Sequence, residues 1–243
     1  MKIEHGMPNK IADQVARLDW NKLQGSLDEQ GYAKLPALLD EEGCDVIIRT
    51  YEQDELFRST IDMGRFRFGD GEYKYYCNPL PSWLQELRTS LYPELSKTAN
   101  RWHEQLGKEF RYPSNLDEFI QRCHQRGQTR PTPLILKYEA GGYNCLHQDL
   151  YGEVFFPFQV VFALNQYGLD YEGGEFLLVE ARPRAQSRGR VVTLNRGEGL
   201  IFPTQYRPVS GTKGYYRTTL RHGVSEITAG MRYSLGVIFH DAL

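Results

Sequence analysis

The sequence predicts an α+β protein whose core is a double-stranded β-helix, or jelly roll, with N-terminal helices packed outside it. From Pro133 onward, eight short strand-like segments follow one another, separated by glycine-rich turns and without helical interruption. Before that point, helical patterns dominate. The 243 residues show no repeat and no obvious linker, so we expect one domain. Its mainly helical layer would span residues 1–132, and the jelly-roll core would span residues 133–243.

The N-terminal layer is expected to contain both helices and strands. Residues 10–23 suit an amphipathic helix, because their apolar side chains recur at helical spacing. A short strand within residues 31–39 leads to Asp40, a candidate N-cap of a helix that runs to about Tyr51. The remaining expected elements are strands at residues 59–67 and 72–77, a long helix at 81–106 that opens with proline, and a helix at 116–126.

The core strands are expected where apolar and β-branched residues form short runs between turn residues. A rolled sheet built from such strands brings residues that are far apart in the chain to neighbouring positions. The eight expected strands lie at residues 134–138, 143–147, 156–164, 175–179, 191–194, 199–202, 215–224 and 232–240.

The composition excludes several classes of protein. The chain is 40% hydrophobic and 25% charged, which is typical of a globular protein and not of a disordered one. The first six residues lack the apolar stretch of a signal peptide, and no apolar run approaches the roughly 18 residues that cross a membrane. Four cysteines lie far apart without a CxxC pair, which favours reduced thiols and a cytoplasmic location: Cys44, Cys77, Cys123 and Cys145.

The net charge of −2 argues against strong overall attraction to nucleic acid. The charge is unevenly distributed, however. Residues 181–222 contain eight arginines and one lysine against one glutamate, a net charge of +8, which leaves −10 for the rest of the chain. This segment could border the mouth of a site and bind a polyanion, or it could be an ordinary solvated loop surface.

Two histidines and one carboxylate are the candidate metal ligands. His147 and Asp149 stand two residues apart, so an extended backbone would point both side chains to one face. Such a pair arises often by chance, but His222 could join it if a rolled sheet returns a distant strand to the same place. The alternative for His222 is a histidine that is hydrogen-bonded to backbone. Two histidines and a carboxylate can bind one face of an iron ion and leave the other positions open.

An arginine and a serine near the C-terminus extend this candidate site. Arg232 and Ser234 share one face of the last expected strand, and the apolar residues between and after them face the other way. A buried arginine is costly unless it is paired, and a bidentate carboxylate together with the serine hydroxyl would meet that cost. The carboxylate could belong to an acidic co-substrate. The alternative is a structural ion pair with Glu175 or Asp170.

Taken together, these motifs resemble the Fe(II)/2-oxoglutarate-dependent dioxygenase superfamily over roughly residues 134–241. The segment from His222 to His240 is similar to prolyl-hydroxylase-type members, and the run from Tyr138 to Asp149 is similar to AlkB-type nucleic-acid demethylases. The overall resemblance is closest to a bacterial family labelled as nucleic-acid oxygenases. The matching motifs are Tyr138-x-x-Gly141 before His147-x-Asp149, Gly173-Gly174-Glu175-Phe176, and His222-Gly223-Val224 leading to Gly230-x-Arg232-x-Ser234.

The resemblance implies a catalytic core that couples oxidative decarboxylation of 2-oxoglutarate by O2 to hydroxylation of a substrate. AlkB-type members carry an asparagine where this chain has Leu136 and a second arginine where it has Ile238, which weakens the demethylase interpretation and leaves the oxygenase interpretation intact. The resemblance implies that Fe(II) is bound by His147, Asp149 and His222. It implies that Arg232 and Ser234 bind the distal carboxylate of 2-oxoglutarate, and that Tyr138 forms a hydrogen bond with this co-substrate.

Four further residues are candidates for the substrate pocket. Tyr143 and Cys145 alternate onto the face of His147, so both are expected to point toward the iron. Arg182 and Arg184 could contact phosphates, or they could cover a loop.

The leading functional hypothesis is a 2-oxoglutarate-dependent oxygenase, and oxidative demethylation of alkylated nucleic acid is one candidate reaction. Hydroxylation of a protein, for example at proline, or of a small molecule is the alternative. A different class would be a cupin-like metal-binding protein without redox chemistry. That class does not call for Arg232 and Ser234 in register after His222. A membrane partner is not expected.

Overall fold

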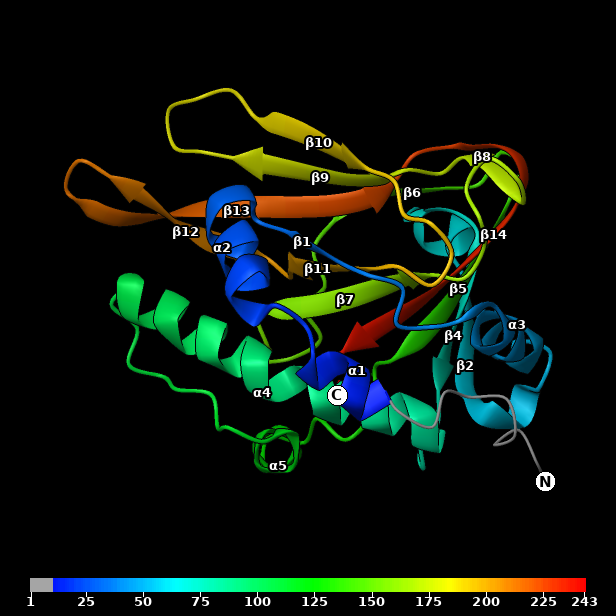
Figure 1. The fold of residues 1–243 in the computed structure, drawn as a ribbon, viewed down its shortest axis with the longest axis horizontal. Coiled ribbons are helices and arrows are strands. Elements are labelled where there is room, and N and C mark those ends of the chain that lie inside the picture. Colours follow the sequence, from blue (N-terminus) through cyan, green and yellow to red (C-terminus); the bar gives the residue numbers. More distant parts are fainter. Residues whose placement is uncertain (1–10) are drawn as a thin grey trace.

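The computed structural model describes residues 11–243 and contains two mostly antiparallel β-sheets, with helices packed against one of them (Figure 1). The expected absence of a signal peptide depends on residues 1–6, which lie outside the described residues. Lys10, the first residue of the first expected helix, also lies outside them. No helix within residues 11–243 is both long enough and apolar enough to cross a membrane. The helices are α1 (Ile11–Ala16), α2 (Trp20–Gln30), α3 (Glu41–Thr50), α4 (Ser82–Gln105) and α5 (Leu116–His124).

Side-chain caps explain where the first helices begin. Asp40 accepts a hydrogen bond from the backbone N of Gly43 at 2.8 Å, which confirms the predicted N-cap of α3. The prediction of one helix over residues 10–23 is wrong, because α1 ends and α2 begins within it. The carboxylate of Asp19 caps the second start by accepting a hydrogen bond from the backbone N of Lys22 at 3.0 Å.

The larger sheet has eight strands that come from both halves of the chain. β14 lies at its centre and pairs with β7 on one side and β5 on the other. The layer that was predicted to be mainly helical also supplies edge strands. In order across the sheet, the strands are β1 (Ala33–Leu35), β11 (Gly199–Pro203), β7 (Phe158–Ala163), β14 (Ile227–Ile238), β5 (Leu134–Glu139), β4 (Glu72–Tyr76) and β2 (Phe57–Asp62), with β8 (Tyr171–Gly173) paired to β14.

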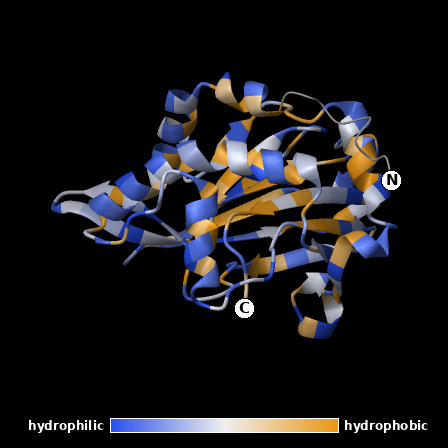
Figure 2. Ribbon diagram, turned by 90° about the horizontal axis from the view of Figure 1, so that it is seen from below, coloured by the Kyte–Doolittle hydropathy of each residue, from blue (hydrophilic) through white to orange (hydrophobic). Residues whose placement is uncertain are grey.

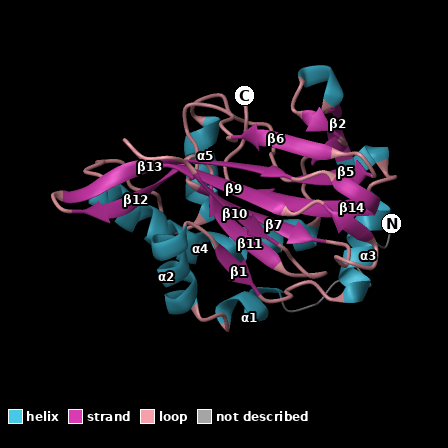
Figure 3. Ribbon diagram, turned by 90° about the horizontal axis from the view of Figure 1, so that it is seen from above, coloured by secondary structure: helices cyan, strands magenta, loops and turns pink. Residues whose placement is uncertain are grey.

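The smaller sheet has six strands and lies on the side of the larger sheet away from α4 (Figures 1 and 3). Its β12–β13 hairpin projects beyond the rest of the molecule, at the left of Figure 1. The strands are, in order, β10 (Arg188–Val192), β9 (Phe176–Ala181), β13 (Gly214–Val224), β6 (Tyr143–His147) and β3 (Gly69–Asp70), with β12 (Tyr206–Gly211) paired to β13.

Several strand predictions differ from the structure. The strands β3, β8 and β12 were not expected: β3 has two residues, β8 has three and β12 contains a proline, so none of them carries a clear alternating pattern. The strand expected at residues 59–67 continues only to Asp62. A 3₁₀ turn, η2 (Gly64–Phe66), follows it and leads to β3; a further turn, η1 (Asp54–Leu56), precedes β2.

Alternate residues of the larger sheet pack into two separate cores. On β7, Val160 packs toward the helices and Val161 toward the smaller sheet. On β14, Tyr233 packs toward the helices, whereas Arg232 and Ser234 line a cavity between the sheets, which confirms the predicted facing. Figure 2, which views the molecule from the helical side, shows apolar strands behind the helices and a hydrophilic tip on the projecting hairpin. The two-sided burial of these strands fixes their register.

Just beyond β14, His240 is completely buried beside a cationic side chain. Its Nδ1 accepts a hydrogen bond from the backbone N of Phe156 at 3.2 Å, a role that requires a neutral ring. Arg88 donates hydrogen bonds to the carbonyl oxygens of Ile238 and Phe239 and forms a 2.9 Å ion pair with the next residue, Asp241. Burial, and then the charge of Arg88, lower the pKa of His240 to about 4.

This buried histidine is expected to make the protein less stable in acid. Between the ordinary pKa of about 6.5 and the folded value of about 4, the unfolded chain binds a proton that the folded chain does not, so stability is lost as pH falls through that window. From about pH 7.5 to about pH 5, His240 alone should cost roughly 2 kcal/mol of unfolding free energy. Urea denaturation of the wild type and of His240→Gln at both pH values measures this. Equal pH dependence in the two proteins would contradict it.

Candidate metal centre and its pocket

A cavity of about 300 Å³ lies between the two sheets and is lined by residues of both. Strands β5, β7 and β14 of the larger sheet form one wall, and β6, β9 and β13 of the smaller sheet form the opposite wall. The structure brings all of the candidate metal and co-substrate residues into this one cavity, although they are spread over nearly a hundred positions of the sequence: Tyr138, His147, Asp149, His222, Arg232 and Ser234.

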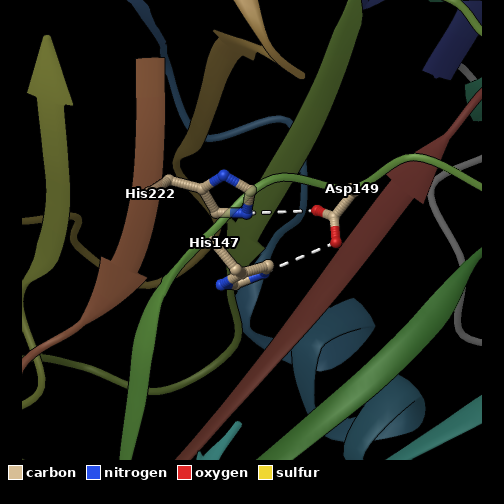
Figure 4. Close-up of side chains that lie close together, drawn as sticks. All are labelled: His147, Asp149 and His222. Atoms are coloured by element: carbon tan, nitrogen blue, oxygen red, sulfur yellow. Dashed lines mark ion pairs between the residues drawn. The ribbon is translucent and has the colours of Figure 1, made fainter. Parts of the chain in front are cut away.

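Two adjacent strands and the loop after one of them form the candidate metal cluster (Figure 4). His222 of β13 and His147 of β6 are direct partners in the antiparallel register, and Asp149 follows β6. An oxygen of the Asp149 carboxylate lies 3.4 Å from Nε2 of His147, and the other lies 3.1 Å from Nε2 of His222. All three ligand atoms lie within 4.8 Å of one another, so one metal ion can contact all of them.

A β-bulge changes which residues of β6 face the cavity. His147 pairs with His222, but Asn144 pairs with Val224, so one extra residue of β6 lies between the two pairs. His147 and Asn144 both line the cavity as a result, whereas Tyr143 and Cys145 do not and are exposed. The expectation that these two residues share the face of His147 is therefore wrong, because simple alternation does not continue through the bulge.

A glycine is required where the two strands approach each other at the bulge. A Cβ atom on Gly223 would lie 2.6 Å from the carbonyl oxygen of Asn144, which is closer than real Cβ contacts. This close approach explains why glycine follows His222 directly. It also keeps β13 near enough to β6 for the two histidine rings to lie 4.3 Å apart, centroid to centroid.

Hydrogen bonds hold the Asp149 carboxylate and the His147 ring in place. Tyr151 Oη donates to one oxygen of Asp149 at 2.8 Å, and Gln159 Nε2 donates to the other at 2.8 Å. Nδ1 of His147 donates to the carbonyl oxygen of Cys145 at 2.7 Å, which leaves the lone pair of a neutral ring on Nε2, toward the cluster. Sequence reasoning missed Tyr151 and Gln159. Gln159 could have been found from the sequence, because it is a single amide side chain within the otherwise apolar run of β7.

The three side chains shift one another's ionisation. Burial opposes ionisation of Asp149, but the charge of His222 and the hydrogen bonds from both histidines outweigh it and hold the pKa of this carboxyl well below its usual range. Burial also disfavours the charged form of His147, yet its hydrogen bond to Asp149 raises the pKa overall. For His222, burial dominates and lowers the pKa. Asp149 is therefore already a carboxylate and His222 already a neutral ring, so neither has to lose a proton before it binds a metal ion.

The ring of His222 is fixed by aromatic packing. Phe176 of β9 stacks on it with the ring centroids 5.8 Å apart and the planes 9° apart, and Phe202 of β11 packs against it at 4.7 Å. Phe176 is the last residue of the Gly-Gly-Glu-Phe motif, so the structure gives this motif a role beside the metal cluster. Its glycines form the turn between β8 and β9.

The cavity also holds a buried and uncompensated positive charge. Arg232 is 3% exposed, and its guanidinium donates to Oγ of Ser234 at 3.2 Å. Within residues 11–243, no carboxylate forms an ion pair with Arg232, and its Nε has no hydrogen-bond partner. The alternative of a structural ion pair is not met, because Glu175 is bonded to Ser225 and Tyr167. A buried guanidinium in this state fits an anionic ligand, as 2-oxoglutarate would be.

A tyrosine beside Arg232 and an asparagine bonded to that tyrosine also line the cavity. The Tyr138 side chain is completely buried, and its ring lies 5.6 Å from the Arg232 guanidinium. Its hydroxyl accepts a hydrogen bond from Nδ2 of Asn144 at 3.2 Å. Asn144 was not expected at the site, because only the bulge in β6 turns it inward. The amide that reaches Tyr138 of β5 therefore comes from β6, a strand of the opposite sheet.

The basic segment at residues 181–222 does not gather at the cavity. Arg182 and Arg184 lie between β9 and β10 and are not among the cavity-lining residues. Arg182 and the buried Arg207 both pair with Glu180, at 3.3 Å and 3.0 Å. A role for Arg182 and Arg184 in binding substrate stays a prediction. Part of the excess positive charge is therefore neutralised inside the fold.

Comparison with known proteins places the chain in a family. The model of the Oxygenase-NA family, described as "Oxygenase, catalysing oxidative methylation of damaged DNA", matches residues 71–242. The chain belongs to the Oxygenase-NA family. Uncharacterised proteins from two strains of Mycobacterium tuberculosis are each 50% identical to it over 164 residues, which cover 68% of this chain and 70% of theirs.

Three solved structures are similar to this Oxygenase-NA protein in fold. One is a Pseudomonas putida prolyl-4-hydroxylase, with a TM-score of 0.53, 12% identity, and coverage of 92% of this chain and 100% of that one. The second is a 2OG-Fe(II) oxygenase family oxidoreductase from Burkholderia pseudomallei, with a TM-score of 0.53, 16% identity, and coverage of 91% of both chains. The third is a Trichoplax adhaerens prolyl hydroxylase in complex with a hypoxia inducible factor peptide, with a TM-score of 0.51, 16% identity, and coverage of 94% and 91%.

The family match and the chemistry of the cavity agree. The protein is an oxygenase of this family, and it has the fold of solved 2OG-Fe(II) oxygenases. The cavity offers a ligand set suited to a metal ion and a buried cation suited to an acidic co-substrate. The donor set of two imidazoles and one carboxylate suits iron, and the unpaired guanidinium suits the dicarboxylate 2-oxoglutarate, so the residues present fit both groups.

Proposed function

We propose that His147, Asp149 and His222 bind Fe(II) and that Arg232 and Ser234 bind the distal carboxylate of 2-oxoglutarate. The observation that carries the proposal is the uncompensated guanidinium of Arg232, buried in the same cavity as the metal cluster. A cupin-like metal protein without redox chemistry gives no reason to bury this charge. In a 2-oxoglutarate oxygenase, the metal cluster would bind iron and the buried guanidinium would bind the co-substrate.

The residues of the cavity would bind and orient iron and 2-oxoglutarate, while these groups, together with O2, would supply the oxidising power. With 2-oxoglutarate and O2, bound Fe(II) supplies the oxidation of a substrate C–H bond at the expense of 2-oxoglutarate, which leaves as succinate and carbon dioxide. Arg232 and Ser234 fix one end of the dicarboxylate, and Tyr138 packs beside it. Apolar walls from β5 and β7 keep bulk water out of the cavity.

We further propose that the two sheets form a jelly roll and that the whole chain is one oxygenase domain. The cavity is enclosed between the two sheets, as in a rolled double sheet. The main apolar core supports a single unit, because it joins helices of the first half to strands of the second. Trp102 of α4, for example, packs on Phe158 of β7 with their rings 4.6 Å apart.

For the substrate we propose an N-alkylated base of nucleic acid, which the enzyme demethylates oxidatively. The description of the Oxygenase-NA family supports this class of substrate. Exposed cations of the β9–β13 region that carry no ion pair within the described residues, such as Arg217 and Arg221, support contact with a polyanion. Hydroxylation of an N-methyl group gives a hydroxymethyl group, whose C–N bond then breaks to leave N–H and formaldehyde.

Formaldehyde release tests this substrate class. With Fe(II), 2-oxoglutarate and O2, an oligonucleotide that carries an N-methylated base is expected to give one formaldehyde for each succinate, and the unmethylated oligonucleotide none. Hydroxylation of a proline-containing peptide, with no formaldehyde from methylated oligonucleotides, would favour the peptide alternative and contradict the demethylase proposal.

A further inference from the structure

We propose that an exposed platform at the cavity mouth binds unpaired bases of a single-stranded nucleic acid. The inference rests on the proposed function and names the form of nucleic acid that the site accepts. We call the platform the aromatic rim. It consists of Phe66, Phe68 and Leu150.

The aromatic rim is a concentration of exposed apolar side chains. Phe66 is 56% exposed and Phe68 is 48% exposed, and their rings stack with centroids 5.9 Å apart and planes 19° apart. Three of the eleven large apolar side chains that are exposed within residues 11–243 belong to the rim. Single exposed apolar residues are ordinary, whereas a stacked pair of exposed phenylalanines beside a cavity indicates a binding surface.

The rim is attached to the strand that carries a candidate iron ligand. The carbonyl oxygen of Phe68 accepts a hydrogen bond from the backbone N of Cys145 at 2.7 Å, and β3 then pairs with β6 through Gly69 and Asn144. Phe68 and Leu150 also line the cavity that contains the metal cluster. A molecule that stacks on the rim is therefore held directly beside the iron site.

The backbone presents the two phenylalanines outward in a fixed arrangement. The buried Met63 anchors the turn: its carbonyl oxygen accepts hydrogen bonds from the backbone N of Phe66 and of Phe68, both at 3.1 Å. Arg67, between them, has a φ of 59°, a left-handed conformation that is unfavourable for arginine. The turn holds this strained residue in place and leaves both rings uncovered. Such strain is typical of functional loops.

Alternating cations and rings favour a nucleic acid over a peptide. Arg65 and Arg67 flank Phe66 and are exposed, so they can reach phosphates while bases stack on the rings. An extended peptide would need a free sheet edge, and the edge strand here, β3, has only two residues. Asp62 pairs with Arg65 at 3.4 Å, so stacking, and not charge, must supply most of the affinity.

The depth of the metal cluster requires an unpaired base. Asp149 and His222 are buried and line the cavity, so a reacting atom must enter the cavity to reach them. An atom of a base inside a duplex cannot reach this depth, because its neighbours above and below remain stacked on it. A single strand pays no cost of unpairing, and its neighbouring bases can stack on the exposed phenylalanines instead.

Fluorescence anisotropy with labelled decathymidylate measures this binding. The full chain, with and without Mn(II) and 2-oxoglutarate, is titrated at several salt concentrations, and a duplex of ten base pairs serves as the competing ligand. We expect tighter binding of the single strand than of the duplex. With two phosphate contacts, the slope of log affinity against log salt should be about −1.4. Phe66→Ala and Phe68→Ala should each weaken binding roughly 5- to 150-fold.

Two further variants separate stacking from a general loss of structure. Phe66→Trp keeps a stacking ring and should bind at least as tightly as the wild type. Phe110→Ala removes an exposed phenylalanine outside the rim and should leave binding unchanged. The inference is overturned if both alanine variants of the rim bind like the wild type, if the duplex binds as tightly as the single strand, or if the rim variants lose only the turnover of a peptide. Because no step of this assay needs iron chemistry, failure of the oxygenase proposal would leave its result unaffected.

Discussion

Asp149→Ala is expected to abolish Fe(II) binding and all consumption of 2-oxoglutarate. Asp149 is the one anionic donor of the candidate cluster, and its oxygens lie 3.4 Å and 3.1 Å from the two histidines. Loss of a residue that merely orients a ligand costs about 10- to 100-fold in metal affinity, so loss of the ligand itself should exceed that range. Anaerobic equilibrium dialysis with Fe(II) and an assay of succinate formation measure the two effects.

A neighbouring acid provides the matched control for this variant. Glu153 lies four residues further along the same loop, is exposed and forms only a surface ion pair with Arg126 at 3.6 Å. Glu153→Ala should retain Fe(II) binding and turnover. If Asp149→Ala binds Fe(II) as the wild type does, the cluster is not the iron site.

Arg232→Met is expected to have two opposite effects. Loss of a buried, charge-assisted pair with the carboxylate of 2-oxoglutarate should weaken binding of this co-substrate by about 30- to 5000-fold. In the absence of ligand, the same variant should be more stable than the wild type by roughly 1–4 kcal/mol, because it removes a buried charge that has no carboxylate partner within the described residues. The KM for 2-oxoglutarate and urea denaturation without ligand measure the two quantities.

The combination is diagnostic, because a purely structural arginine would not produce it. If Arg232 stabilised the fold through its hydrogen bond to Ser234, Arg232→Met would lower stability and leave the KM for 2-oxoglutarate nearly unchanged. Arg126→Met, which changes an exposed arginine that does not line the cavity, should alter neither quantity. An unchanged KM in Arg232→Met would contradict the assignment of the co-substrate site.

The faces of β14 could be predicted from the sequence, whereas those of β6 could not. Along β14 the alternation is regular, so Arg232 and Ser234 were correctly expected on one face. In β6 a bulge opposite Gly223 turns Asn144 inward and leaves Cys145 outside. A bulge arises from the pairing of two distant strands, and the pattern within one strand does not contain that information.

The residues that support the cluster were also beyond sequence reasoning. Tyr151 and Gln159 contact Asp149 only because the loop after β6 of the smaller sheet packs against β7 of the larger sheet. The basic excess near Arg182 could be counted, but its partial neutralisation by the buried Glu180 depends on tertiary structure. The exposed stack of Phe66 and Phe68 was hidden because the segment was expected to continue as a strand.

Anaerobic addition of Fe(II) and 2-oxoglutarate to the wild-type protein tests the central claim most directly. The account predicts a visible charge-transfer band, because it places iron and 2-oxoglutarate at adjoining positions of one cavity. The band should be absent from Asp149→Ala for lack of iron and from Arg232→Met at moderate 2-oxoglutarate concentrations. A wild-type protein that binds Fe(II) and shows no band at saturating 2-oxoglutarate would contradict the account.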